Sequence, residues 1–175
     1  MFYSIAIIIL LVTIIKLTLN RVKPNVLTIG QTAPSFELHD ETGTLQSLRA
    51  YKGKKVILYF YPKDNTPGCT SQACSLRDGY KDLQEHGFTI LGVSFDSPES
   101  HRAFIQKNNL PFHLLSDSDK TVTKAYGALM IGNIAPQRKT FIINEKGIID
   151  AILSDVDIKN HAEQILALSK KQHTS

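Results

Sequence analysis

The residues best suited to chemistry are the two cysteines of the chain, Cys69 and Cys74. Only the thiolate is a strong nucleophile, and an ordinary free thiol is about 3% ionised at pH 7. Cys69 is expected at the start of a helix, where unpaired N–H groups and a partial positive charge favour a thiolate. That effect is worth up to about 1.5 pKa units, so such a thiol is about half ionised. A reactive Cys69 therefore needs a fixed cation nearby; the alternative is an ordinary small buried residue.

The sequence on both sides of Cys69 predicts the elements that position it. An apolar run at residues 56–61 is expected to form a buried strand, and the prolines and glycine of residues 62–68 force a loop. The apolar positions that then recur with helical period are Ala73, Leu76, Tyr80 and Leu83, and the pattern ends at Gly87. Cys69 is thereby placed where a loop turns into a helix.

Strands and helices alternate along the rest of the chain. We expect a small hairpin at residues 35–47, strands at 89–95 and 112–115, helices at 97–108 and 120–126, and a hairpin at 138–153. Asp157 is expected to cap a last helix, and Asp96 to act in a turn or cap rather than in a carboxylate site. This order predicts an α/β sandwich with a central sheet flanked by helices.

The stretch around the cysteines resembles the peroxiredoxin family. Pro62, Thr66 and Cys69 match the signature P-x-x-x-T-x-x-C. Cys74, five residues after Cys69, resembles the resolving cysteine of the peroxiredoxin Q group, also called bacterioferritin comigratory proteins. Matching stretches at 30–36, 92–94, 96–101, 114–117 and 124–127 extend the resemblance from about Val26 to the C-terminal helix. The resemblance implies a thioredoxin fold.

The same resemblance implies an antioxidant enzyme, a thiol-dependent peroxidase that reduces hydrogen peroxide and organic hydroperoxides. Cys69 would attack the peroxide and become a sulfenic acid, and Cys74 would condense with it to a disulfide. A thioredoxin-like or glutaredoxin-like partner would then reduce this disulfide. Thr66 is expected to hydrogen-bond to the peroxide and the thiolate, and Pro62 to shield the pocket from water. The group implies a monomer, and the reaction calls for no cofactor or metal.

Arg138 is the candidate for the fixed cation. The family places an active-site arginine at the start of a strand, and the sequence from Arg138, R-K-T-F-I, resembles that site. Along a strand Arg138, Thr140 and Ile142 share one face, whereas Lys139 points to the other. The alternative is a solvated arginine at a strand end.

Two other functions of thioredoxin-fold proteins stay open. A membrane-tethered thiol–disulfide oxidoreductase usually carries C-x-x-C, and a copper-binding chaperone would need C-x-x-x-C with a histidine ligand. The spacing here is C-x-x-x-x-C, which argues against both. The six histidines show no close metal-binding spacing, and the chain lacks the glycine-rich and Walker motifs of nucleotide sites.

Residues 1–24 lie outside the resemblance and are strongly apolar. As a helix, residues 2–19 would reach about 27 Å, close to the roughly 30 Å hydrocarbon core of a bilayer. A signal peptide fits less well, because no basic region precedes the apolar part and no small-x-small cleavage site follows it. We therefore predict an uncleaved transmembrane helix in residues 1–24 and a peroxiredoxin domain in residues 25–175; a buried core helix is the alternative.

The charges bear on membrane orientation and on partners. The first 23 residues contain three cations, Lys16, Arg21 and Lys23, and no acid, which favours a cytoplasmic catalytic domain on a single-pass anchor. The periplasmic or extracytoplasmic orientation stays open. The remainder holds 17 basic and 16 acidic side chains, so the net charge of +4 does not indicate nucleic-acid binding.

Overall fold

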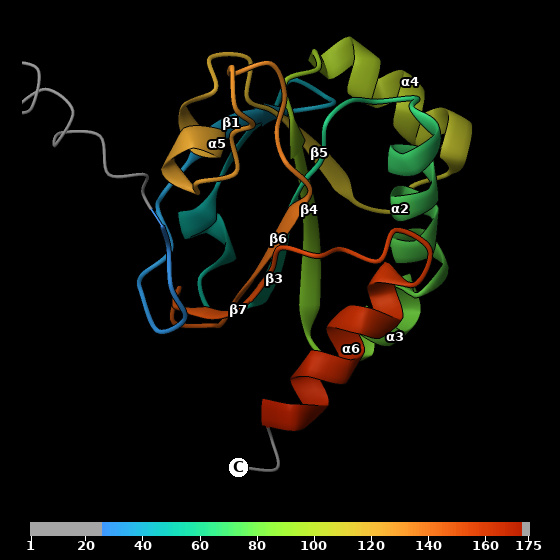
Figure 1. Ribbon diagram of the computed structural model, residues 1–175. Coiled ribbons are helices and arrows are strands. Elements are labelled where there is room, and N and C mark those ends of the chain that lie inside the picture. Colours follow the sequence, from blue (N-terminus) through green and yellow to red (C-terminus); the bar gives the residue numbers. More distant parts are fainter. Residues whose placement is uncertain (1–25, 173–175) are drawn as a thin grey trace, which may run out of the picture.

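A mixed β-sheet organises the structure, a computed structural model that describes residues 26–172 (Figure 1). In this part of the chain seven strands lie in the order β2-β1-β5-β4-β3-β6-β7. Their bounds are β1 Glu37–Asp40, β2 Leu45–Ser47, β3 Lys55–Phe60, β4 Phe88–Ser94, β5 His113–Ser116, β6 Lys139–Ile143 and β7 Ile149–Leu153. The central strands β3, β4 and β5 are parallel, whereas β6 pairs with β3 antiparallel.

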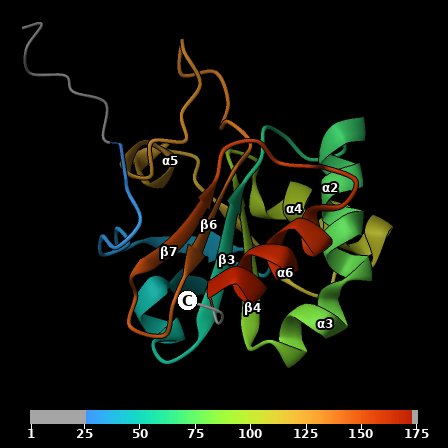
Figure 2. The same ribbon diagram turned by 60° about the horizontal axis from the view of Figure 1, so that its bottom comes forward.

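Helices cover both faces of the sheet (Figures 1 and 2). They are η1 Leu48–Tyr51, α2 Pro67–Asp78, α3 Tyr80–Glu85, α4 Pro98–Asn108, α5 Thr121–Ala125 and α6 His161–Gln172. The larger layer, α2, α3, α4 and α6, packs on one face, and η1 and α5 pack on the other. This is the predicted α/β sandwich, and the short hairpin β1–β2 is the predicted N-terminal hairpin.

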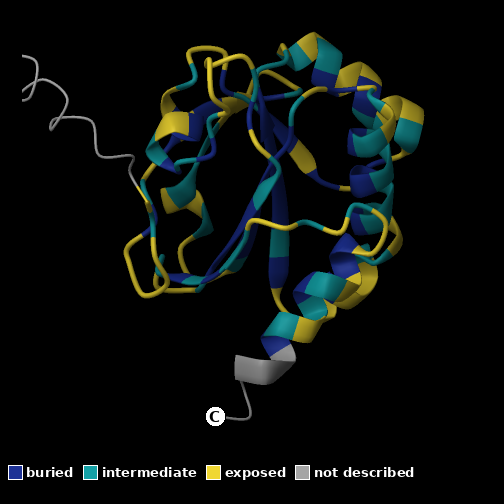
Figure 3. Cartoon of the chain, viewed as in Figure 1, coloured by how far each residue is buried: buried dark blue, intermediate teal, exposed yellow. Residues whose placement is uncertain are grey.

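Strand β3 shows why the sheet is buried on both faces. Its residues alternate, so that Ile57 and Tyr59 pack under the larger helical layer, whereas Val56, Leu58 and Phe60 pack on the face covered by η1 and α5. All five are almost fully buried, and the centre of the sheet is dark blue in Figure 3. Such a strand is a continuous apolar run, which is how it was recognised in the sequence.

The helix after Cys69 is interrupted, contrary to the prediction of one helix reaching Leu83. The structure ends α2 at Asp78 and begins α3 at Tyr80. A Cβ atom at Gly79 would lie 2.4 Å from the Cβ of Ala162, so α6 can approach this closely only at a glycine. The apolar spacing continues across the break because both short helices pack on the same core, and periodicity alone could not reveal it.

The fold prediction is wrong in its membrane helix. None of the helices described here is long and apolar enough to span a bilayer. The stretch predicted to do so, residues 2–19, lies outside the described residues, as does the predicted domain boundary at residue 24. The prediction rested on the length and apolar character of residues 2–19 and on the cations that follow them. The corrected fold is the α/β sandwich with its N-terminal hairpin.

Candidate active site

Cys69 lies in the first turn of α2, as the sequence predicts. The helix begins at Pro67, whose missing N–H is no loss in the first turn, and Thr66 precedes it in an extended conformation. The Cys69 side chain is 2% exposed, and Cys74 is half-buried. Both are free thiols, and both lie within the single helix α2.

Arg138 brings a positive charge to Cys69. Its Nη2 atom donates to the Sγ atom of Cys69 at 3.3 Å, and its Nη1 atom donates to Oε1 of Gln72 at 2.8 Å. Arg138 immediately precedes β6. Thr140 lies two residues further along, on the face of the sheet that the larger helical layer covers, where it contacts His161 of α6. Lys139 points to the opposite face, where its ammonium lies over the ring of Phe141. The cation is thus held in place by two residues on one face of α2.

Gly68 leaves room for the guanidinium. A Cβ atom at this position would lie 2.8 Å from Nη2 of Arg138 and 3.7 Å from the side chain of Ile158. A contact of 2.8 Å is shorter than non-bonded atoms tolerate, so Arg138 would have to move away. The absence of a side chain at residue 68 therefore leaves room for the guanidinium where it lies.

A chain of hydrogen bonds continues from Arg138 into the core. Gln72, which accepts from Arg138, is fully buried, and its Nε2 atom lies 3.4 Å from Nδ1 of His161. The Nε2 atom of His161 lies 3.0 Å from the hydroxyl of Thr140. Burial, together with the positive charge of Arg138, lowers the pKa of His161 to about 4, although Asp157 opposes this. The imidazole is therefore neutral at pH 7.

A buried carboxylate holds the loop before α2. Asp64 accepts hydrogen bonds from the hydroxyl of Tyr61 at 2.6 Å and of Ser100 at 2.8 Å, and from Nδ1 of His101 at 2.9 Å. Burial alone would raise the pKa of Asp64, but these donors hold it below its ordinary value. The backbone N–H of Asp64 donates to Asp96 at 3.0 Å, so Asp96 has a structural role, but this contact joins a distant loop and is not the expected local turn or cap. The loop that leads to Cys69 is thereby tied to α4 and β4.

Two residues of the predicted site lie beside the cysteine without an observed contact to its sulfur. The hydroxyl of Thr66 donates to the carbonyl of Lys63 at 3.1 Å. Pro62 is half-buried at the start of the same loop. The structure thus joins Cys69 with Arg138 directly, and it places Thr66 and Pro62 in the neighbouring loop.

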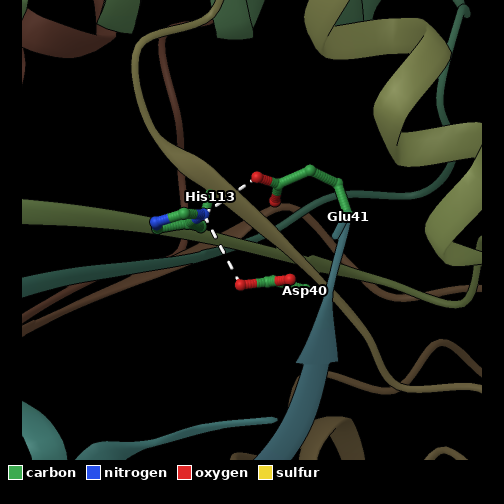
Figure 4. Close-up of side chains that lie close together, drawn as sticks. All are labelled: Asp40, Glu41 and His113. Carbon is green, nitrogen blue, oxygen red and sulfur yellow. Dashed lines mark hydrogen bonds and ion pairs between the residues drawn. The ribbon is translucent and has the colours of Figure 1, made fainter. Parts of the chain in front are cut away.

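A second cluster lies at the far end of the hairpin (Figure 4). The Nδ1 atom of His113 lies 2.9 Å from Glu41 and 3.7 Å from Asp40, and the three side chains could in principle surround a metal ion. Burial would raise the pKa of Asp40, but several donors, including Gln46 at 2.7 Å, hold it below its ordinary value. Its oxygens are therefore already used by the protein. The cluster joins the hairpin to β5, and sequence spacing could not reveal it because His113 and Glu41 are 72 residues apart.

Sequence reasoning missed several residues that build the site. Gln72 lies three residues after Cys69, so helical spacing alone places it on the same face of α2, and that signal was available. His161 and Gly68 carried no local signal, since their roles depend on Arg138 and on contacts between distant segments. The partners of Asp64 are likewise visible only in the fold.

The fold and the buried thiol beside a guanidinium define a thiol enzyme of the α/β class, and comparison with known proteins makes this specific. The sequence model of the AhpC/TSA family matches residues 29–152. A bcp-type peroxiredoxin of Coxiella burnetii is 46% identical over 144 residues, which span 79% of this chain and 95% of that protein.

Solved structures of the peroxiredoxin Q and bacterioferritin comigratory group have the same fold. The structure of Xylella fastidiosa PrxQ has a TM-score of 0.77 at 31% identity and is matched over 85% of this chain and 98% of that chain. The bacterioferritin comigratory protein of Xanthomonas campestris has a TM-score of 0.72 at 33% identity, over 80% and 92% of the two chains. The chain therefore belongs to the AhpC/TSA family and, within it, to the peroxiredoxin Q or bacterioferritin comigratory group. It is a thiol-dependent peroxidase with a thioredoxin fold, which confirms the function inferred from the resemblance.

The substitution Gly68→Ala tests the close approach of Arg138. We expect the added methyl group to displace the guanidinium, so that the thiolate fraction at pH 7 falls and peroxide reduction slows roughly tenfold, as the loss of one charged hydrogen bond implies. The helix itself should not suffer, because alanine is a better helix former than glycine. Thr70→Ala in the same turn is the control. A Gly68→Ala enzyme as fast as the Thr70→Ala enzyme would contradict this account.

Proposed function

We propose that this peroxiredoxin uses Cys69 as its peroxidatic cysteine and Cys74 as its resolving cysteine, with hydrogen peroxide and organic hydroperoxides as substrates. The observation that carries this assignment is the 3.3 Å contact between Arg138 and the Cys69 sulfur at the start of α2. Two positive influences, a guanidinium and a helix N-terminus, converge on one buried thiol. The alkyl peroxide reduction activity named for the Xanthomonas campestris protein supports organic hydroperoxides as substrates.

In the first step the Cys69 thiolate attacks one oxygen of the peroxide. An S–O bond forms, the O–O bond breaks, and the leaving oxygen departs as alkoxide or hydroxide and takes a proton from water. Arg138 stabilises the thiolate and the negative charge that develops on the oxygens. The hydroxyl of Thr66 can rotate from the Lys63 carbonyl towards the peroxide, and Pro62 limits the access of water. Cys69 becomes a sulfenic acid.

In the second step the Cys74 sulfur attacks the sulfenic sulfur, so that an S–S bond forms and the S–O bond breaks. The departing hydroxide takes the thiol proton of Cys74 and leaves as water. The helix as observed does not allow this. Residues five apart in a regular helix have Cα atoms about 8.6 Å apart, whereas a disulfide needs about 4.4–6.8 Å. Cys69 and Cys74 both lie in α2, so the first one to two turns must unfold. The hydrogen bond of 3.3 Å from Ser71 to the carbonyl of Ile158 lies in these turns and would break.

The third step reduces the disulfide and regenerates both thiols. A dithiol of a thioredoxin-like or glutaredoxin-like partner reduces the disulfide by exchange and is itself oxidised. Unfolding of the first turns supports this step, because it brings a half-buried and a buried sulfur into reach of the partner. Both cysteines belong to one helix of one chain, so the cycle needs no second subunit, which supports a monomer as the working unit.

Replacing each cysteine in turn separates the two half-reactions. Cys69→Ser should abolish peroxide consumption, because only the attacking thiol breaks the O–O bond. Cys74→Ser should consume one equivalent of peroxide and then stop as the sulfenic acid. Stopped-flow mixing with stoichiometric peroxide, followed by mass spectrometry, measures both. Consumption of a full equivalent by the Cys69→Ser protein would show that the assignment is wrong.

Hydrogen exchange tests the unfolding of α2. The amides from Ser71 to Arg77 should be well protected in the reduced protein and lose much of this protection once the disulfide forms. The reason is that the Cα atoms of Cys69 and Cys74 are too far apart in an intact helix for the disulfide to close. The Cys74→Ser protein treated with the same peroxide is the control, because it is oxidised without forming the bond. Equal protection in the reduced and disulfide forms would rule out Cys74 as the partner of Cys69.

A further inference from the structure

His161 connects the two elements that carry the reactive pair. It is the first residue of α6, its side chain is fully buried, and its ring lies edge-on to Tyr59 at 6.2 Å. One ring nitrogen contacts Gln72 of α2, and the other contacts Thr140 of β6. Neither contact reaches the sulfur of Cys69, so any effect of His161 on the reaction must pass through Gln72 and Thr140.

The hydrogen atoms along this chain can be assigned in only one way. Arg138 can only donate, so the Gln72 atom that faces it must be the oxygen. The amide nitrogen of Gln72 therefore faces His161 and donates to Nδ1, which must carry a lone pair. The proton of the neutral imidazole then sits on Nε2 and is donated to the hydroxyl of Thr140.

The neutral form of His161 is required by this arrangement and is favoured by its surroundings. A protonated imidazole would point N–H at the amide N–H₂ of Gln72, and the amide would have to turn its oxygen away from Arg138. Burial is the main cause that disfavours the charged form, and the charges that act on the ring are Arg138, which also disfavours it, and Asp157, which favours it.

His161 forms a bridge of hydrogen bonds between Gln72 and Thr140, and the positions of these two partners show which elements the bridge connects. Gln72 lies three residues after Cys69 and thus on the same side of α2, and Thr140 lies two residues after Arg138 on the same face of β6. A link between Gln72 and Thr140 therefore fixes the helix and the strand from which the thiol and the guanidinium project. It also orients the Gln72 oxygen that anchors the second guanidinium nitrogen.

We propose that His161 is a positioning residue of the peroxidatic site, which acts through Gln72 and Thr140 to hold Arg138 against Cys69. This inference rests on the proposed function of Cys69. Because Gln72 lies in the part of α2 that must unfold for disulfide formation, His161 stabilises the folded, peroxide-reactive form selectively. Loss of the bridge should slow the reaction of Cys69 with peroxide and should leave disulfide formation as fast as before or faster.

The test replaces His161 by alanine, asparagine and glutamine. Asparagine can place an acceptor near Nδ1 and keep the Gln72 contact, whereas glutamine reaches only the Thr140 side. In a Cys74→Ser background, alkylation of Cys69 by iodoacetamide at pH 7 reports its thiolate without any need for peroxidase activity. We expect His161→Ala and His161→Gln to react about five- to tenfold more slowly. His161→Asn keeps the contact that orients the Gln72 oxygen towards Arg138 but loses Thr140, so its rate should lie between those of these variants and the parent. His86→Ala, which removes an exposed histidine, is the control.

The two half-reactions supply the second readout. With Cys74 present, His161→Ala should lose about five- to tenfold in the rate of sulfenic acid formation but none in the rate of disulfide formation. Alkylation at the parental rate in folded His161→Ala would overturn the proposal. If that variant does not fold, equal rates for the asparagine and glutamine variants would overturn it instead. A failure of the proposed function would appear elsewhere, as peroxide consumption by the Cys69→Ser protein.

Discussion

The contact between Arg138 and Cys69 compensates for the burial of the thiol, which disfavours its charged form. A buried thiol resists ionisation, yet only the thiolate reacts with peroxide. A helix N-terminus carries only a partial positive charge, whereas a guanidinium carries a full one. The guanidinium at 3.3 Å is therefore the larger influence, and whatever fixes its position fixes the reactivity of the site.

The sheet register and the helix packing supply that position. Phe60 pairs with Lys139, the first residue of β6, so Arg138, which immediately precedes β6, lies beside the loop that begins after Tyr61 and leads to Cys69. Gly68 admits the guanidinium, and Gln72 receives its second nitrogen, with His161 behind it. The same contacts that make α2 reactive oppose its unfolding, which the disulfide with Cys74 requires. The enzyme's cycle is thus a balance between a folded form for attack and an unfolded form for resolution.

Local patterns predicted the elements that carry this site, the family resemblance supplied the candidate residues, and long-range packing accounts for what both missed. The loop-to-helix transition placed Cys69, and strand alternation placed Arg138 and Lys139 on opposite faces, as observed. The break at Gly79 and the bridge through His161 depend on α6, which lies some ninety residues further along the chain. No pattern around residues 69–79 could have shown them. The membrane helix was inferred from the length and apolar character of a terminal stretch, and no helix of the described residues has that character.

The most direct test of the central claim measures the thiolate of Cys69 itself. Ultraviolet difference absorbance at pH 7, with and without alkylation of Cys69, gives its thiolate fraction in the Cys74→Ser protein and in versions that also carry Arg138→Ala or Arg138→Lys. The account predicts the largest thiolate fraction in the parent, a large loss with alanine and an intermediate value with lysine, which keeps the charge but not the paired donors. A folded Arg138→Ala protein with the parental thiolate fraction would contradict it.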